Sequence, residues 1–172
     1  MTIELTGKTS GTVRSHNEAT LAAVWEQALL VLPQGVEGGR MLETTPAKVA
    51  EAPFSGRCPT LLFAHGSSGI NPAIREFAHF IAQEAGWAVV VPDSMQTKDR
   101  LVYTSPVARS DYEAVHAMRS DELVYAARKL FGAPWFSGVY AVAGTSEGGV
   151  AAARFDSTGL AVREKAKLIF SW

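Results

Sequence analysis

A short apolar run that leads directly into a serine between two glycines constrains this chain more than any other feature. Residues 139–143 (Val-Tyr-Ala-Val-Ala) predict a buried strand of a parallel sheet. Residues 144–148 (Gly-Thr-Ser-Glu-Gly) follow at once, and the small residues after them predict a helix. A G-x-S-x-G sequence between a strand and a helix is typical of a nucleophile elbow, a sharp turn that leaves the serine strained and its hydroxyl exposed.

Steric constraints explain why this motif has two glycines. Gly144 and Gly148 lie two residues on either side of Ser146, where a β-carbon would clash with the neighbouring strand or helix. The turn also aims the first free N–H groups of the helix at the space above Ser146, where a tetrahedral oxyanion would develop. A glycine-rich loop with an ordinary serine is the alternative, and the flanking strand and helix favour the elbow. The motif therefore predicts that Ser146 is a nucleophile.

Apolar runs and helical periodicities alternate along the rest of the chain. The sequence predicts helices over residues 18–32, 72–85 and 110–131, and strands over residues 40–49, 59–64, 87–91 and 166–172. Ser110 and Glu113 predict a capping box at the start of the last of these helices. Continuous apolar strands between helices indicate an α/β fold, with a mostly parallel sheet and helices on both faces. We expect a single domain, in which residues 1–58 form an arm, a helix and an early strand, and residues 59–172 form the core.

Composition narrows the classes of function. The net charge is −1 over 172 residues, so no strong field favours nucleic acid or an anionic membrane. No apolar run is long enough to span a membrane, and the N-terminus lacks a basic-then-apolar signal. Cys58 is the single cysteine, and the four histidines are scattered, so we expect no disulfide, no metal and no cofactor. These features predict a soluble, cytoplasmic protein.

Two glycine-rich turns are expected to meet at one edge of the sheet. Residues 65–69 (His-Gly-Ser-Ser-Gly) end one predicted strand, and residues 144–149 end another. Because ligands bind at the carboxyl ends of parallel strands, both turns can face the same pocket.

An irregular segment over residues 94–109 lies above the same edge in this arrangement. It carries Arg100, Tyr103 and Arg109, which are candidate substrate contacts, because loops at strand ends concentrate such contacts and an arginine there could bind a carboxylate. Solvated loop charges are the alternative.

Three segments of the chain resemble the α/β-hydrolase superfamily and, within it, the dienelactone hydrolase-type proteins. They are residues 63–69 (Phe-Ala-His-Gly-Ser-Ser-Gly), 89–94 (Val-Val-Val-Pro-Asp-Ser) and 143–149 (Ala-Gly-Thr-Ser-Glu-Gly-Gly), in the order and spacing of that family. The resemblance covers residues 59–172. It implies an α/β-hydrolase-like fold and a serine hydrolase, an esterase or lactonase, that attacks an ester, lactone, thioester or amide carbonyl.

The resemblance also implies roles for particular residues. Ser146 would be the acyl nucleophile, and the backbone N–H groups of Ser67 and Glu147 would form the oxyanion hole. His65 would hold the oxyanion loop by hydrogen bonds, and the alternative is that it serves as the general base. His65 and Gly66 are further candidate substrate contacts.

One departure from the superfamily pattern affects the expected activity. The acid and the histidine of that superfamily follow the nucleophile along the chain, and here no histidine follows His116. A serine without a general base is a weak nucleophile at neutral pH. We therefore expect a C-terminally truncated hydrolase that lacks the last strands, the acid and the catalytic histidine.

Two alternatives remain open at this point. One is a non-catalytic pseudoenzyme that binds a small molecule, and the other is a subunit whose triad is completed in trans by a partner chain. The apolar residues 167–172 would form an open sheet edge, which favours pairing with another strand, as in a homo-oligomer. The expected substrate is a small-molecule ester or lactone.

Overall fold

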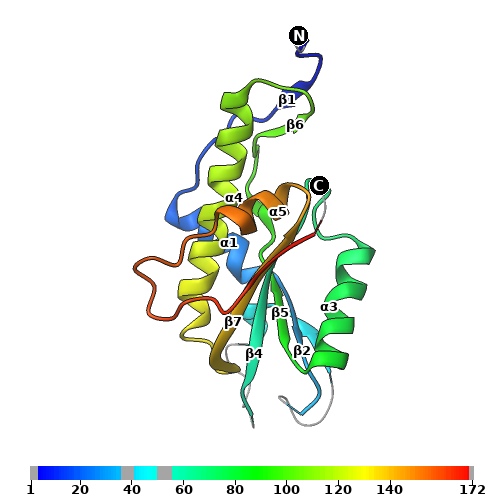
Figure 1. Ribbon diagram of the computed structural model, residues 1–172, viewed down its shortest axis with the longest axis vertical. Helices are drawn as coiled ribbons and strands as arrows, with labels where there is room; N and C mark the ends of the chain where they lie inside the picture. The colour runs from blue at the N-terminus through cyan, green and yellow to red at the C-terminus, as the bar shows by residue number, and fades with distance from the viewer. Residues whose placement is uncertain (1–3, 36–40, 50–55, 171–172) are drawn as a thin grey trace.

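Six strands of the described residues form the central sheet, and their order determines where the glycine-rich turns lie. The structure is a computed structural model that describes residues 4–35, 41–49 and 56–170 (Figure 1). Its strands are β1 (Lys8–Ser10), β2 (Leu29–Leu32), β3 (Leu42–Thr44), β4 (Cys58–Ala64), β5 (Ala88–Val91), β6 (Val102–Thr104), β7 (Phe136–Thr145) and β8 (Lys167–Phe170). Its helices are α1 (Glu18–Glu26), α2 (Pro46–Val49), α3 (Pro72–Ala85), α4 (Arg109–Leu130) and α5 (Glu147–Arg154), with a 3-10 turn, η1, at Ser94–Gln96.

The strands of the sheet lie in the order β3-β2-β5-β4-β7-β8. Strands β5, β4, β7 and β8 run parallel to one another, whereas β2 is antiparallel to both of its neighbours. The expectation of an α/β fold with a mostly parallel sheet is therefore confirmed. Parallel neighbours end at the same edge, so the turns that follow β4, β5 and β7 are brought together there (Figure 1).

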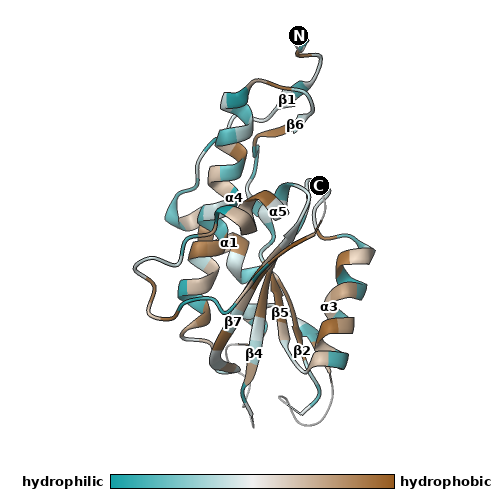
Figure 2. Ribbon diagram, viewed as in Figure 1, coloured by the Kyte–Doolittle hydropathy of each residue, from teal (hydrophilic) through white to brown (hydrophobic). Residues whose placement is uncertain are grey.

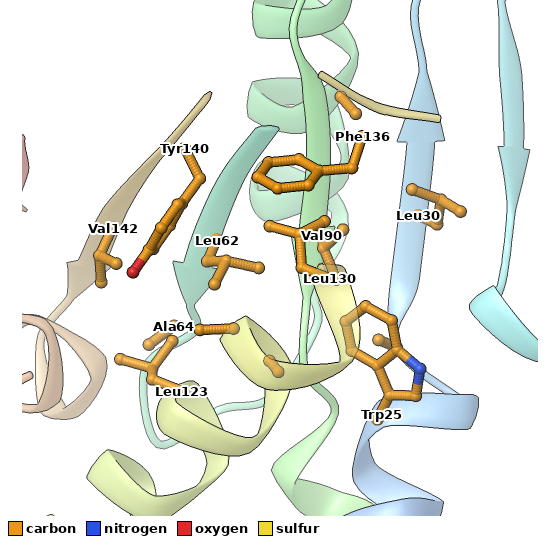
Figure 3. Close-up of a cluster of buried hydrophobic side chains, with 14 of the residues drawn as sticks. Trp25, Leu30, Leu62, Ala64, Val90, Leu123, Leu130, Phe136, Tyr140 and Val142 are labelled. Carbon is orange, nitrogen blue, oxygen red and sulfur yellow. The ribbon is translucent and has the colours of Figure 1, made fainter. Parts of the chain in front are cut away.

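Alternate residues of each strand face opposite layers of helices. On one face, Leu62 of β4 packs in a cluster with Trp25 of α1 and Leu123 of α4 (Figure 3). On the other face, the next residue, Phe63, packs in a cluster with Ile74 of α3. Figure 2 shows that the strands between the two layers carry mostly hydrophobic residues. Helices therefore cover both faces, as the sequence predicts, and their packing holds the strand ends in fixed register.

The helix predicted over residues 18–32 is wrong in its second half. Helix α1 begins after Asn17, whose side chain accepts a hydrogen bond from the backbone N–H of Thr20, and it ends at Glu26. Residues 29–32 (Leu-Leu-Val-Leu) form β2 instead, and all four are buried. A strand between two layers buries side chains on both faces, whereas a surface helix buries one stripe. Burial on both faces therefore overrides the helical spacing of these leucines.

Other predicted elements need smaller corrections. The capping box predicted at Ser110 is wrong, because α4 begins at Arg109 and no side chain caps it. The strand predicted over residues 40–49 is shorter than expected: β3 occupies its middle, α2 occupies its end, and its first residue lies outside the described residues. Residues 171–172, at the end of the last predicted strand, also lie outside them. The predicted helix at α3 and the strands at β4 and β5 are confirmed.

A smaller layer rises above the edge that carries the turns. There β1, from the N-terminal arm, pairs antiparallel with β6, from the segment predicted as irregular. The first half of α4 extends beyond the sheet to reach this pair (Figure 1). Leu101 packs there against Val115 and Met118 of α4. The arm and the segment after β5 are therefore held close to the strand ends.

Candidate functional site

Ser146 lies at the tip of the turn between β7 and α5. Its backbone has φ 54° and ψ −125°, in a region that residues other than glycine rarely adopt. Such a conformation costs on the order of 1–3 kcal/mol, so the packing around the turn has to impose it. The residue is exposed to solvent. The strained turn and the exposed serine that the motif predicts are thus both present.

Two glycines permit this turn, because other backbone atoms occupy the places where their β-carbons would be. A β-carbon on Gly148 would lie well under 3.0 Å from the carbonyl oxygens of Ala64 and His65, just after β4. A β-carbon on Gly144 would meet the Gly148 carbonyl in the same way. Helix α5 therefore starts in direct backbone contact with the end of β4, and this contact places Ser146 beside the turn that follows β4.

That turn forms the second wall of the candidate site. A β-carbon on Gly66 would lie 3.3 Å from Ser146 Cβ and 3.9 Å from Ser146 Oγ, so the turn and the serine are direct neighbours. Within residues 56–170, neither the Ser67 nor the Glu147 backbone N–H donates a hydrogen bond to another group. Glu147 is the first residue of α5, where the helix dipole favours negative charge. Within the described residues, these two N–H groups thus have no bonded acceptor, one on the residue after Ser146 and one on the residue after Gly66.

The side chain of Glu147 is buried between two arginines. Arg100 Nη2 pairs with Glu147 Oε1, and Arg119 Nε lies 3.4 Å from the same oxygen. Arg100 is 5% exposed. The sequence predicts Arg100 as a substrate contact or a solvated loop charge, and the structure corrects both alternatives. A buried guanidinium needs a counter-ion, and Glu147 supplies it.

Arg119 and Glu122 extend these contacts along α4. Arg119 Nη1 donates to Glu122 Oε2 at 2.5 Å, and Arg119 Nη2 donates to the carbonyl oxygen of His65 at 2.5 Å. Glu122 Oε1 accepts a hydrogen bond from the Ser94 hydroxyl at 2.6 Å and pairs with His16 Nε2 at 2.9 Å. Burial alone would raise the pKa of Glu122, but the Arg119 charge and the hydrogen bonds from His16 and Ser94 outweigh it and lower the pKa to about 2. The buried ion cluster comprises four side chains: Arg100, Arg119, Glu122 and Glu147.

His65 is fully buried within the same arrangement. Its Nε2 accepts a hydrogen bond from the Ser94 backbone N–H at 3.2 Å, so Nδ1 carries the proton and donates to the Gly66 carbonyl oxygen at 2.6 Å. Burial, followed by the charge of Arg119, lowers the pKa of His65 to about 3, which keeps the ring neutral. His65 therefore has no free nitrogen for the Ser146 proton and no surface for a substrate, which corrects its assignment as a candidate contact.

The two other candidates from the segment above the sheet lie in different surroundings. Tyr103, on β6, is half-buried, and its ring meets that of Tyr112 edge to face, with the centroids 4.8 Å apart. Burial, followed by the charge of Glu147, raises the pKa of Tyr103 to about 12, so its hydroxyl remains a hydrogen-bond donor at neutral pH. Arg109 has a side chain that is 93% exposed, 3.9 Å from Glu113, so the structure leaves it in solvent.

A polar hollow of about 570 Å³ lies along the flank of the β4 turn that faces β5, β2 and β3. Ser68 and Gly69 of the turn line it, together with Asp93 after β5. Its remaining lining includes charged and polar side chains from β3, α2 and α3: Glu43, Thr44, Thr45, Lys48 and Arg75. In the turn after β4, Gly66 therefore lies next to Ser146, and Ser68 lines a hollow that is large enough for a ligand.

Sequence reasoning missed the buried ion cluster, although one signal for it exists. Arg119 lies four residues after Val115 and four before Leu123, and both of these apolar side chains are buried. A charged residue on an apolar helix face, with Glu122 three residues further on, indicates a buried pair. No comparable signal identifies His16, which lies 106 residues away along the chain and meets Glu122 only in the fold.

No model of a known protein family matches this chain, and no curated protein shows significant similarity to it. Among the described residues, no group of three or more metal-ligating side chains could hold a metal ion, and no helix has the length and apolar composition to cross a membrane. Burial raises the pKa of the Cys58 thiol, which makes Cys58 a poor nucleophile at neutral pH.

Gly148→Ala tests whether the backbone contact holds the turn. The added methyl group would overlap two carbonyl oxygens at the end of β4. We expect the free energy of unfolding to fall by about 3 kcal/mol or more, measured by urea denaturation. Gly132→Ala is the control, because its β-carbon would make an ordinary contact of 3.8 Å with Lys129, and it should be neutral or stabilise by up to about 1 kcal/mol. Equal effects of the two substitutions would contradict the assignment.

Glu122→Gln tests the charge pairing of the buried ion cluster. The folded pKa of Glu122, about 2, lies below its ordinary value of 4.5, so its contribution to stability is fully present above the ordinary pKa and is lost as the pH falls toward the folded one. We expect the variant to lose on the order of 3 kcal/mol at neutral pH and to show a shallower loss of stability under acid.

The measurement is urea denaturation of both proteins at a series of pH values from neutral to acid. Glu113→Gln is the control, because Glu113 makes an exposed pair with Arg154 and should change stability little. Wild type and Glu122→Gln with the same dependence of stability on pH would show that Glu122 is not held as a carboxylate.

Proposed function

We propose that this protein is a serine hydrolase of the esterase or lactonase type, with Ser146 as its acyl nucleophile. The observation that carries the proposal is the Ser146 backbone, at φ 54°, in a turn fixed by two glycines against the end of β4. A strained, exposed serine between a parallel strand and a helix is how α/β-hydrolases present their nucleophile. The sequence resemblance to dienelactone hydrolase-type proteins supports the same conclusion.

In the proposed reaction, the Ser146 hydroxyl oxygen attacks the carbonyl carbon of a small-molecule ester or lactone. The carbonyl oxygen becomes an oxyanion, which the backbone N–H groups of Ser67 and Glu147 stabilise by hydrogen bonds. Collapse of the tetrahedral intermediate breaks the bond to the leaving oxygen and leaves an acyl group on Ser146. Water then attacks this acyl group and releases the acid.

A general base has to accept the Ser146 proton, and no histidine of the described residues is hydrogen-bonded to Ser146. His65 has both ring nitrogens engaged, His16 pairs with Glu122, and His79 pairs with Glu43. The fourth histidine, His116, is buried on α4 with its ring stacked on that of Tyr112. We therefore propose that a group other than these histidines accepts the Ser146 proton.

The exposed edge strand β8 supports the proposal that a partner chain supplies the general base. Within the described sheet it pairs with β7 alone. Each of its four residues is exposed, including Leu168 at 44% and Phe170 at 40%. An apolar edge strand with unpaired backbone groups invites pairing with another strand. A strand added there by a second copy of this chain would bring new side chains beside β8, which pairs with β7, the strand that ends just before Ser146.

A second candidate function is binding of a small molecule without turnover. The absence of a hydrogen-bonded base at Ser146 among the described residues favours it. The polar hollow beside the β4 turn would hold this ligand, since Ser68, Lys48 and Arg75 of its lining suit a polar molecule. The two candidates differ in one property, the reactivity of the Ser146 hydroxyl.

Labelling with a fluorophosphonate probe measures that reactivity directly. We expect the folded protein to be labelled at Ser146, and the labelling to be lost in Ser146→Ala, because the probe needs an activated serine. Ser137→Ala is the matched control: Ser137 is also an exposed serine, but it lies at the other end of β7, far along the strand from Ser146. That variant should be labelled like the wild type.

Two other outcomes have definite meanings. A folded wild-type protein that is not labelled would contradict the hydrolase proposal and support binding without turnover. Labelling that persists in Ser146→Ala would show that a different side chain reacts.

A further inference from the structure

One guanidinium links the parts of the candidate site. Arg119 Nη2 donates to the His65 carbonyl oxygen at 2.5 Å, in the turn after β4. Its Nε lies 3.4 Å from Glu147 Oε1, on the first residue of α5. Its Nη1 donates to Glu122 Oε2 at 2.5 Å, on α4 itself. Arg119 therefore joins the two turns that flank Ser146 and anchors both of them to a long helix.

We propose that Arg119 is a positioning residue that sets the spacing between the Ser67 and Glu147 backbone N–H groups. This inference rests on the proposed function, in which those two groups stabilise the oxyanion. His65 lies two residues before Ser67, so the bond to its carbonyl oxygen fixes the start of the turn. Glu147 is itself the second donor residue, so the hold on its side chain limits movement of the first turn of α5.

The packing of the two turns supports this role. The His65 carbonyl oxygen that Arg119 binds is one of the atoms that leave no room for a β-carbon on Gly148, in the first turn of α5. The same oxygen therefore receives the Arg119 hydrogen bond and contacts the helix that begins at Glu147. The Arg119 side chain is 1% exposed, so it has no surface for a substrate and acts through the groups it holds.

Geometry, more than charge, makes an arginine necessary at this position. A guanidinium is planar and presents its donors in fixed directions, whereas a lysine offers one nitrogen at the end of a flexible chain. Three groups on three segments contact Arg119 through three different nitrogens, two of them by hydrogen bonds, whereas a lysine would present its donors from one nitrogen. Arg119→Lys keeps the charge of the buried ion cluster and changes its geometry, so it isolates the positioning role.

The test compares one reaction that forms an oxyanion with one that does not. In a Ser146→Cys variant, the thiolate attacks p-nitrophenyl acetate, an oxyanion forms on the acetyl carbonyl, and p-nitrophenolate leaves. With iodoacetamide the same thiolate displaces iodide from a saturated carbon, and no oxyanion forms. Mass spectrometry of the peptide that contains position 146 separates both products from any reaction at Cys58.

We expect Arg119→Lys, added to Ser146→Cys, to slow acylation by about 10- to 100-fold and to leave alkylation within about twofold, since a small misplacement of catalytic donors has effects of this size. Arg154→Lys is the matched control. Arg154 lies at the other end of α5 and pairs with exposed Glu113, so neither rate should change. The specific loss of acylation is a result that general damage to the fold would not produce.

Each other result overturns the inference in a recognisable way. Equal losses in both rates would show that Arg119 only stabilises the fold, and unchanged rates would show that it does not position the donors. The proposed function itself would be overturned if the Ser146→Cys variant, with Arg119 intact, were acylated no faster than free cysteine. If near-UV circular dichroism shows that Arg119→Lys does not fold, Glu147→Gln takes its place. It keeps the backbone N–H and weakens the ties of this side chain to both Arg100 and Arg119, so the same selective loss of acylation is expected.

Discussion

The backbone contact between the start of α5 and the end of β4 is the constraint on which the candidate site depends. Gly148 lies so close to the carbonyl oxygens of Ala64 and His65 that no β-carbon fits between them. Because this contact involves main-chain atoms, it fixes the direction in which the chain leaves β7 and holds Ser146 in a strained conformation. A serine released from it would relax by about 1–3 kcal/mol and would lose its fixed position beside Gly66.

The buried ion cluster also constrains the two turns beside Ser146. Its two arginines and two glutamates balance in charge, yet taking four charges out of water is costly, and well-packed apolar side chains would often be as stable. Stability alone therefore does not explain the cluster. Arg119 donates a hydrogen bond to the main-chain carbonyl of His65 and lies 3.4 Å from the Glu147 carboxylate, so one side chain contacts both turns beside Ser146. The cluster also joins the N-terminal arm to α4, because His16 pairs with Glu122. Segments that are distant in sequence are therefore held together close to the turn after β4.

The sequence predicts the parts of this protein that local patterns determine. The turn around Ser146 could be anticipated because a buried strand, two glycines and a small-residue helix are adjacent along the chain. Strand β2 could not, because its leucines have helical spacing and only the layers above and below make it a strand. The environment of Arg100 could not be anticipated either, since its partner, Glu147, lies 47 residues further along the chain. Contacts between distant segments decide burial, and burial decides whether a charge is solvated or paired.

The most direct test of the central claim is ¹¹B nuclear magnetic resonance of phenylboronic acid bound to the protein. Boron that is attacked by the Ser146 hydroxyl becomes tetrahedral and anionic, and it places an oxygen where the Ser67 and Glu147 N–H groups would stabilise it. We predict a tetrahedral boron signal with the wild-type protein that is absent with Ser146→Ala. A signal that stays trigonal with the folded wild-type protein would contradict the claim that this turn presents a reactive serine beside an oxyanion hole.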